Sequence, residues 1–225
     1  MSQTINPHNK LSPQELAKHL RQPEGETGKE VGLQMNKGNK HICLNTYKVL
    51  APGNNNHILE IGMGNGFFVK EFLQMADNLK YTGIDFSQAM IEEAMDINKE
   101  LITEGKVQFI KASIEKLPIP DSSVDSITTT NTIYFWPQPN QNILELYRVL
   151  KPGGKVLIAY RPKSFMDKLE LTQFGFTKYE QNEVENILAN AGFKQISTEI
   201  ITEPEMDFGG SRFSMEGMFT SGIKA

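Results

Sequence analysis

The chain has 225 residues, enough for one ordinary domain with additional elements but short for two. Its 23 basic and 27 acidic residues give a net charge of -4, which disfavours a protein whose main task is to grip a nucleic-acid backbone. A single cysteine, Cys43, excludes an internal disulfide framework and a cysteine-built metal site, and the four histidines lack a metal-binding spacing. Because no apolar run could cross a bilayer and no apolar leader opens the sequence, we expect a cytoplasmic protein without metal or membrane partner.

Residues 1–50 are predicted to form an N-terminal helical extension that precedes a main domain at 51–225. A helix is predicted over 12–21, because its first residues, Ser-Pro-Gln-Glu, have the capping-box pattern. A second helix is predicted over 41–50, where a Pro-Gly pair follows. Between the two, residues 22–40 are interpreted as mobile and loop-rich, since four glycines lie in a polar stretch.

From residue 57 onward, short apolar runs alternate with amphipathic ones, which is the pattern of strands joined by helices. Strands are predicted at 57–61, 81–85, 107–112, 123–130 and 155–160, and two later strand-like runs at 193–201 and 213–225. Helices are predicted at 67–76, 87–102, 142–150 and 183–191. Helical connections of this length indicate crossovers and a mostly parallel sheet, and the right-handedness of crossovers makes the predicted α/β sheet doubly wound.

The strongest chemical signal lies between Glu60 and Phe67. An apolar strand there runs into three glycines at alternate positions and then into a helix, so that a ligand can approach the backbone closely. The dinucleotide fingerprint would need a small residue where Phe67 stands, and the P-loop pattern is absent. Asp85 ends the next strand, where a carboxylate can accept hydrogen bonds from both hydroxyls of a ribose. Alone, the glycines also fit a turn without a ligand and Asp85 fits a helix cap, but together they favour a nucleotide-like ligand.

Four longer motifs carry a resemblance to a known family. Through them the chain resembles the class I S-adenosylmethionine-dependent methyltransferases, in particular their small-molecule, ubiquinone-biosynthesis-like branch. The motifs are ILEIGMGNGFF, YTGIDFSQAMIEEA, VQFIKASIEKLPIPDSSVDSI and ELYRVLKPGGKVLIA. The resemblance is strong over 55–160. It implies S-adenosylmethionine as the cofactor and a seven-stranded, Rossmann-like, mostly parallel sheet with helices on both faces. The last strand, about 213–225, is expected to insert antiparallel beside the fifth.

Carried over residue by residue, the resemblance implies ten cofactor contacts. From the methionine end to the adenine end they are Glu60, Gly62, Gly64, Gly66, Asn131, Asp85, Phe86, Met90, Ser113 and Ile114. Asp85 resembles the ribose ligand, and Ser113 stands at the adenine edge. The family often has Gly-Asp where this chain has Ala112-Ser113, and a hydroxyl bonds an exocyclic amine more weakly than a carboxylate does. Ser113 equally fits an ordinary strand-end cap.

Methyl transfer from a sulfonium is an in-line displacement, so the protein mainly has to align donor and acceptor and exclude water. The acceptor-side candidates are Tyr134, Trp136 and Tyr160, because aromatic faces attract a cation or form a flat wall. Phe135 and Trp136 equally fit core packing. We expect a small-molecule acceptor and no nucleic acid, while the acceptor, the methylated atom, any general base and the oligomeric state stay open.

The family also suggests a lid. Residues 21–40 combine glycines with apolar residues at alternate positions, Val31, Leu33 and Met35, and we expect them to order over an occupied site. A merely packed N-terminal extension is the alternative. Three alternative functions also stay open: a protein or nucleic-acid methyltransferase, a non-catalytic S-adenosylmethionine-binding module, and a nicotinamide-dependent enzyme, which the glycine spacing disfavours.

Overall fold

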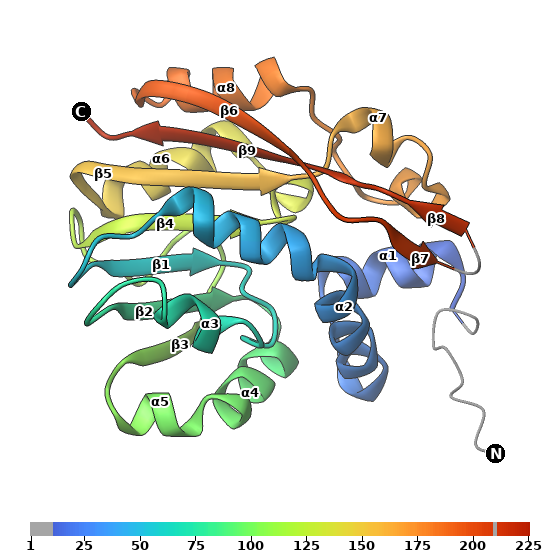
Figure 1. Cartoon of the computed structure of the whole chain (residues 1–225), viewed down its shortest axis with the longest axis horizontal. Coiled ribbons are helices and arrows are strands. Elements are labelled where there is room, and N and C mark those ends of the chain that lie inside the picture. The colour runs from blue at the N-terminus through green and yellow to red at the C-terminus, as the bar shows by residue number, and fades with distance from the viewer. Residues whose placement is uncertain (1–10, 209–210) are drawn as a thin grey trace.

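The computed structural model describes residues 11–208 and 211–225, without the side chains of 206–213. Seven strands form one sheet in the order β3-β2-β1-β4-β5-β9-β6 (Figure 1). Their bounds are β1 His57–Ile61, β2 Lys80–Asp85, β3 Val107–Lys111, β4 Val124–Thr130, β5 Leu150–Tyr160, β6 Lys194–Thr202 and β9 Glu216–Ile223. Strands β7 (Met206–Phe208) and β8 (Ser211–Phe213) form a separate hairpin.

The pairing confirms the predicted sheet. Strands β1 to β5 pair in parallel, whereas β9 runs antiparallel between β5 and β6. Along β5, Val156 and Ile158 face one hydrophobic core and Leu157 and Ala159 face the other, because successive side chains of a strand point to opposite faces. Both faces of the sheet are therefore covered, as a doubly wound fold requires.

Helices cover the two faces of the sheet (Figure 1). One core holds apolar residues of α2 (Gly25–Leu50) and α3 (Val69–Leu73), and the other holds those of α6 (Pro139–Val149) and α8 (Gln181–Asn190). The remaining helices are α1 Pro13–Arg21, α4 Gln88–Ile97, α5 Lys99–Thr103 and α7 Lys163–Met166, with single turns at η2 Ile133–Phe135 and η3 Glu170–Gln173. None of the helices in the described ranges combines the length and the apolar composition of a bilayer-spanning segment.

The prediction of a loop at 22–40 is wrong, because α2 runs as a continuous helix from Gly25 to Leu50. Two of its four glycines, Gly28 and Gly32, are packing positions. A Cβ on Gly28 would lie 2.6 Å from the backbone carbon of Pro23, and one on Gly32 would lie 3.1 Å from Met90 Cε. Tertiary packing thus overrides the low helix propensity of glycine. The second half of α2 crosses the sheet, and its first half stands with α1 at the carboxyl ends of the strands (Figure 1).

A second difference is the break at Asn98 in the helix predicted over 87–102. There α4 ends and α5 begins, and Asn98 has φ of -111° and ψ of 25°. Its side-chain amide Nδ2 donates to Gly66 O at 3.1 Å and to Ala94 O at 3.0 Å. The break therefore supplies a buried amide that holds the last glycine of the loop after β1.

Two glycine-to-alanine substitutions in α2 test this packing. Gly28→Ala is expected to lower the free energy of unfolding by about 1–3 kcal/mol, because the added methyl group meets a backbone atom. Gly38→Ala is the matched control and should raise it by about 0.5–1 kcal/mol, since no atom lies within 4 Å of the new Cβ. Urea denaturation measures both. Equal stabilisation by the two substitutions would contradict the contact between Gly28 and Pro23.

Candidate functional site

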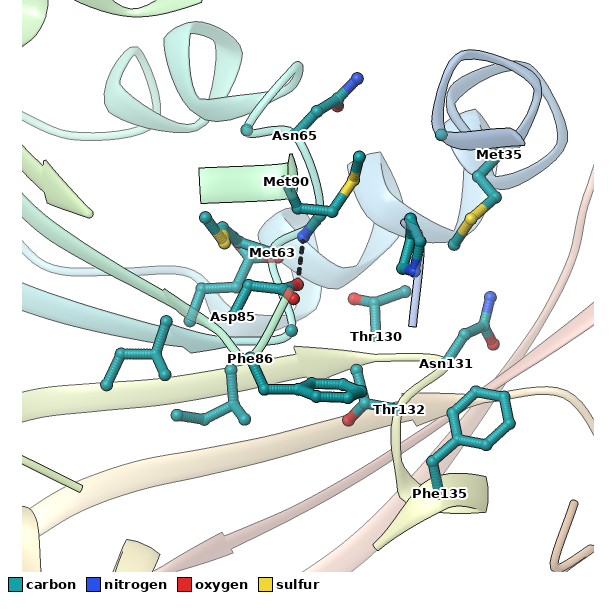
Figure 2. Close-up of a pocket in the computed structure, with 18 of the residues that line it drawn as sticks. Met35, Met63, Asn65, Asp85, Phe86, Met90, Thr130, Asn131, Thr132 and Phe135 are labelled. Carbon is teal, nitrogen blue, oxygen red and sulfur yellow. Dashed lines mark hydrogen bonds between the residues drawn. The ribbon is translucent and has the colours of Figure 1, made fainter. Parts of the chain in front are cut away.

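A cavity of about 270 Å³ lies at the carboxyl ends of the strands, beneath α1 and the first half of α2 (Figure 2). Its lining comes from the loop between β1 and α3, the end of β2, and the segments that follow β3 and β4. In Figure 2, Asp85 and Met63 lie on one side of the cavity, whereas Asn131, Phe135 and Met35 lie on the other. Ligands of open α/β sheets bind at this end of the strands.

The loop after β1 adopts a backbone that needs its glycines. Gly62, Gly64 and Gly66 have φ angles of 69°, 60° and 64°, in the left-handed region that side chains disfavour. A Cβ on Gly62 would also collide with Thr132, and one on Gly66 would lie 3.0 Å from Asn98 Nδ2. Nothing lies within 4 Å of a Cβ on Gly64, so its backbone is left accessible from the cavity it lines.

Asp85 is buried at the end of β2 and receives backbone donors. Gly64 N–H donates to its Oδ2 at 3.1 Å, the bond drawn in Figure 2, and Ser87 N–H donates to its Oδ1 at 2.8 Å. Burial raises the pKa of Asp85 to about 6, although these N–H groups favour the ionised form. Ser87, and not Asp85, caps α4. Because a carboxylate offers about four acceptor positions, Asp85 retains capacity for a ligand in the cavity it lines.

Glu60 is the second buried carboxyl group that lines the cavity. Tyr81 Oη donates to its Oε2 at 2.7 Å and Tyr47 Oη donates to the same oxygen at 3.2 Å. Burial raises the pKa of Glu60 to about 7, and the two tyrosines partly offset that rise. Since Tyr47 belongs to α2, this bond also ties the helix above the cavity to β1.

Sequence reasoning missed most of the cavity-lining face of α2. The residues of this face follow one another at intervals of three or four, apart from one adjacent pair, as one side of a helix requires: Gly32, Met35, Asn36, Asn39, Cys43 and Tyr47. This spacing was the sequence signal for a helix face, but the glycines in the same segment led to the prediction of a loop. The turn from α1 to α2 is fixed as well, because Ser87 Oγ donates to Pro23 O at 2.6 Å. The lid expected at 21–40 thus lines the cavity, and its closure stays a prediction.

The segment after β4 forms the opposite wall. Asn131 has a left-handed φ of 57°, and its Nδ2 donates to Asn39 Oδ1 at 3.1 Å. Tyr134 Oη donates to Asn131 Oδ1 at 3.2 Å and accepts from the N–H of Arg161. The Arg161 guanidinium is in turn buried against Glu203, with Nη2 donating to Oε2 at 3.1 Å. These bonds run unbroken from the C-terminal part of the fold to α2.

All ten predicted cofactor contacts line this cavity, and so does Trp136. Their roles toward a cofactor stay predictions. Ser113 is already engaged locally, because its hydroxyl donates to Glu115 Oε2 at 3.0 Å and accepts from the Glu115 N–H at 3.3 Å. That geometry fits the strand-end cap considered as the alternative.

Two of the acceptor-side candidates lie outside the lining. Tyr134 and Tyr160 are both buried in the core, at 3% and 0% exposure. The Tyr160 hydroxyl is 3.1 Å from Thr220 Oγ1, across the pair of β5 and β9, and burial raises its pKa to about 12. Burial likewise raises the pKa of Tyr134. Tyr134 contributes to the site through Asn131 and does not face the cavity itself.

The comparisons with known proteins agree on one kind of domain. Residues 59–158 match the family described as a methyltransferase domain. The uncharacterized methyltransferase YdaC of Bacillus subtilis is 35% identical over 106 residues, which is 47% of this chain and 56% of that protein. The ubiquinone/menaquinone biosynthesis C-methyltransferase UbiE of an Enterobacter species is 24% identical over 153 residues, 67% of this chain and 61% of that protein.

Solved structures show the same fold at low identity. A SAM-dependent methyltransferase from Aquifex aeolicus superposes with a TM-score of 0.61 at 22% identity, covering 94% of this chain and 98% of that one. Geranyl diphosphate C-methyltransferase from Streptomyces coelicolor superposes with a TM-score of 0.67 at 12% identity, covering 90% and 85%. The fold is therefore the Rossmann-like methyltransferase fold.

Three features together define a class I methyltransferase domain. They are the glycine-rich loop after β1, the carboxylate of Asp85 at the end of β2, and the order of the strands in the sheet. Residues 59–158, a little under half of the chain, are similar in sequence to methyltransferase domains, and the whole chain is similar in fold to an S-adenosylmethionine-dependent methyltransferase. It spans a little over half the length of the curated relatives it matches.

The buried carboxyl group of Glu60 predicts a pH dependence of stability. Its pKa is raised from 4.5 to about 7 in the folded state, so the folded protein holds the proton at pH values where the unfolded chain has lost it. Stability should therefore fall as pH rises from about 4.5 to about 7, by at most about 3 kcal/mol. Glu60→Gln should remove this part of the loss.

Urea denaturation at pH 5 and pH 7.5 measures the effect, with the exposed Glu115→Gln as the matched control. The difference between the two pH values should shrink in Glu60→Gln and persist in Glu115→Gln. An unchanged difference in Glu60→Gln would show that Glu60 ionises without cost in the folded protein.

Proposed function

We propose that this chain binds S-adenosylmethionine in the cavity and transfers its methyl group to a small-molecule acceptor. The observation that carries the proposal is that all ten positions implied by the family resemblance line one cavity at the carboxyl ends of the strands. They come from four separate segments of the chain, at the ends of β1 and β2 and after each of the strands β1 to β4. Because β3, β2, β1 and β4 are parallel neighbours in the sheet, one ligand in this cavity can contact all four segments.

The residues present fit this cofactor. Asp85 has acceptor capacity left for the two hydroxyls of a ribose, and Gly64 offers a backbone without a side chain beside it. The strand order β3-β2-β1-β4 sets the orientation in which the cofactor would lie across the strand ends. Adenine would lie at the ends of β3 and β2, near Ile114 and Met90, and the methionine moiety would lie at the ends of β1 and β4, near Glu60.

When bound, the cofactor supplies an activated methyl group on a sulfonium. The chain's own residues then align the acceptor with that group and exclude water. Asn131 is held on both sides of its amide, by Asn39 and Tyr134, so it can present a fixed surface at the methionine end. Phe135 and Trp136 line the same wall and offer aromatic faces to an acceptor.

A small acceptor is favoured over a polymer because α1 and the first half of α2 roof the cavity. The net charge of -4 also opposes binding of a nucleic-acid backbone. Among the relatives, UbiE carries the name of a ubiquinone/menaquinone biosynthesis C-methyltransferase. We propose further that α1 and the turn at Pro23 act as a lid that excludes water during transfer.

Asp85→Ala tests the cofactor site. Loss of a charged acceptor is expected to weaken S-adenosylhomocysteine binding by about 1.5–3 kcal/mol, measured by calorimetry. The exposed Asp77→Ala is the control and should bind as the wild type does. S-adenosylhomocysteine should also raise the melting temperature, whereas NAD at equal concentration should not. If NAD alone raised the melting temperature, the methyltransferase proposal would be wrong and a dehydrogenase function would be favoured.

Transfer of a labelled methyl group tests the acceptor class. The protein is incubated with labelled S-adenosylmethionine and a cell extract that is fractionated into metabolites, nucleic acid and protein. Label is expected in the metabolite fraction, where mass spectrometry identifies the product. A variant without residues 1–24, which removes α1 and the turn after it, should still bind S-adenosylhomocysteine but lose this transfer.

Label found only in protein or nucleic acid would favour the alternative acceptor classes. Binding without any transfer would favour a non-catalytic module. Full transfer by the shortened variant would remove the lid from the proposal.

A further inference from the structure

A series of hydrogen bonds joins the aromatic wall of the cavity to the start of the glycine-rich loop. At one end, Trp136 Nε1 donates to Thr132 Oγ1 at 3.1 Å. The Thr132 hydroxyl is hydrogen-bonded to the hydroxyl of Thr129, and Thr129 Oγ1 donates to Ile61 O at 2.8 Å. Ile61 O is the last carbonyl before Gly62. The series therefore ends on the first peptide group of the loop.

The available protons give this series a single direction. An indole N–H can only donate, and each threonine hydroxyl carries one proton. Because the Thr129 proton is donated to Ile61 O, the proton between the two hydroxyls must come from Thr132. Each donor, from Trp136 to Thr129, is thus paired with one acceptor. Hydrogen bonds in such a series strengthen one another, so removal of the middle hydroxyl affects both ends.

Thr132 also packs against the loop itself. Its methyl carbon Cγ2 occupies the space in which a Cβ on Gly62 would lie. The Gly62 N–H donates to Ile84 O at 2.7 Å, which fixes the same peptide group to β2. Thr132 is therefore held against the loop by its methyl group and by its hydroxyl group, and Trp136 is bonded to that hydroxyl.

Trp136 can offer a ligand only carbon surface. Its single polar group, the indole N–H, is already donated to Thr132. Trp136 lines the cavity and is buried, with 6% of its surface exposed. Contact with an acceptor molecule there depends on shape, and such contact weakens when the ring moves by a fraction of an ångström. The position of the ring is therefore the property on which an acceptor site at this wall depends.

We infer that Thr132 is a positioning residue that fixes the Trp136 ring relative to the glycine-rich loop and so aligns the acceptor wall with the cofactor. The inference rests on the proposed function, in which that loop carries the cofactor and Trp136 contacts the acceptor. In-line transfer requires this alignment, because a displacement of about 1 Å can reduce the rate about a hundredfold. Two competing roles are direct contact with the cofactor, since Thr132 lines the cavity, and stabilisation of the fold alone.

The first measurement uses the single tryptophan of the chain, which gives one indole N–H signal in the NMR spectrum of isotope-labelled protein. Thr132→Val keeps the side-chain shape but lacks the hydroxyl, so this proton should shift upfield and exchange with solvent at least about tenfold faster. Thr132→Ser keeps the hydroxyl and should retain the wild-type signal. Thr128→Val is the matched control and should also retain it, because the buried Thr128 hydroxyl makes no hydrogen bond among the described residues.

The second measurement tests whether Thr132 acts through Trp136. Labelled S-adenosylmethionine and the metabolite fraction of a cell extract are the probe, used below the melting temperatures of all variants. Thr132→Val should reduce transfer at least about tenfold and keep its affinity for S-adenosylhomocysteine within about twofold of wild type. In the Trp136→Phe background the same substitution should cause no further loss, since a phenyl ring has no N–H to hold. Thr132→Ser should restore most of the transfer, and Thr128→Val should transfer as wild type does.

Three outcomes would overturn the inference. If Thr132→Val loses affinity for S-adenosylhomocysteine as strongly as it loses transfer, Thr132 is a cofactor contact. If it transfers at the wild-type rate and only its melting temperature falls, Thr132 stabilises the fold alone. If it causes an equal further loss in the Trp136→Phe background, Thr132 acts independently of the ring.

A second variant covers a failure of Thr132→Val to fold. Thr132→Ala removes the same hydroxyl with less crowding and should give the same indole signal and the same loss of transfer. Failure of the proposed function has a different signature. Wild-type protein would then bind no S-adenosylhomocysteine or label no metabolite, while the indole signal would still respond to Thr132→Val.

Discussion

The hydrogen bond from the Gly64 N–H to the Asp85 carboxylate joins the two segments on which the cavity depends. It fixes the loop after β1 against the end of β2, and Gly64, which donates it, has a left-handed backbone. Because Asp85 also accepts the N–H of Ser87, the same carboxylate sets the start of α4. Ser87 then holds Pro23 and thereby the roof of the cavity. One buried charge thus organises the floor, one wall and the roof.

Burial of two carboxyl groups in one cavity disfavours their ionised forms, and the fold offsets this with donors of different kinds. Asp85 receives backbone N–H groups, which cannot move away from it. Glu60 receives the hydroxyls of Tyr47 and Tyr81. Since Tyr47 comes from α2 and stacks on Phe72 at a centroid distance of 4.0 Å, the roof helix and the charge state of Glu60 are coupled.

Sequence patterns predicted the sheet and the cavity floor because both follow from local rules. Apolar runs of strand length identify β1 to β5, and the glycines between β1 and α3 need no tertiary contact to suggest a turn that a ligand can approach. The sheet position of β9 came from the family resemblance, and the pairing confirms it.

The roof followed from tertiary packing, which local rules do not contain. Gly28 and Gly32 suggest a loop until Pro23 and Met90 are seen against them. Tyr134 illustrates the same limit. Its position after β4 suggested a side chain facing the acceptor, yet its hydroxyl lies between Asn131 and the backbone of Arg161. Side-chain direction in an irregular segment depends on contacts with distant residues, and no periodicity indicates it.

The place of β9 in the sheet sets an order for biosynthesis. Strand β6 is made before β9, but β9 lies between β6 and β5, so β6 has no sheet neighbour until β9 has left the ribosome. Strands β1 to β5 have no such dependence, and the ends that form the cavity floor can assemble on the nascent chain. Arg161, which pairs with the buried Glu203, completes its hydrogen bonds only in the later step, because it also donates to Glu216 O at the start of β9. The outer part of the sheet should therefore be the aggregation-prone stage of synthesis, when an unpaired edge is exposed.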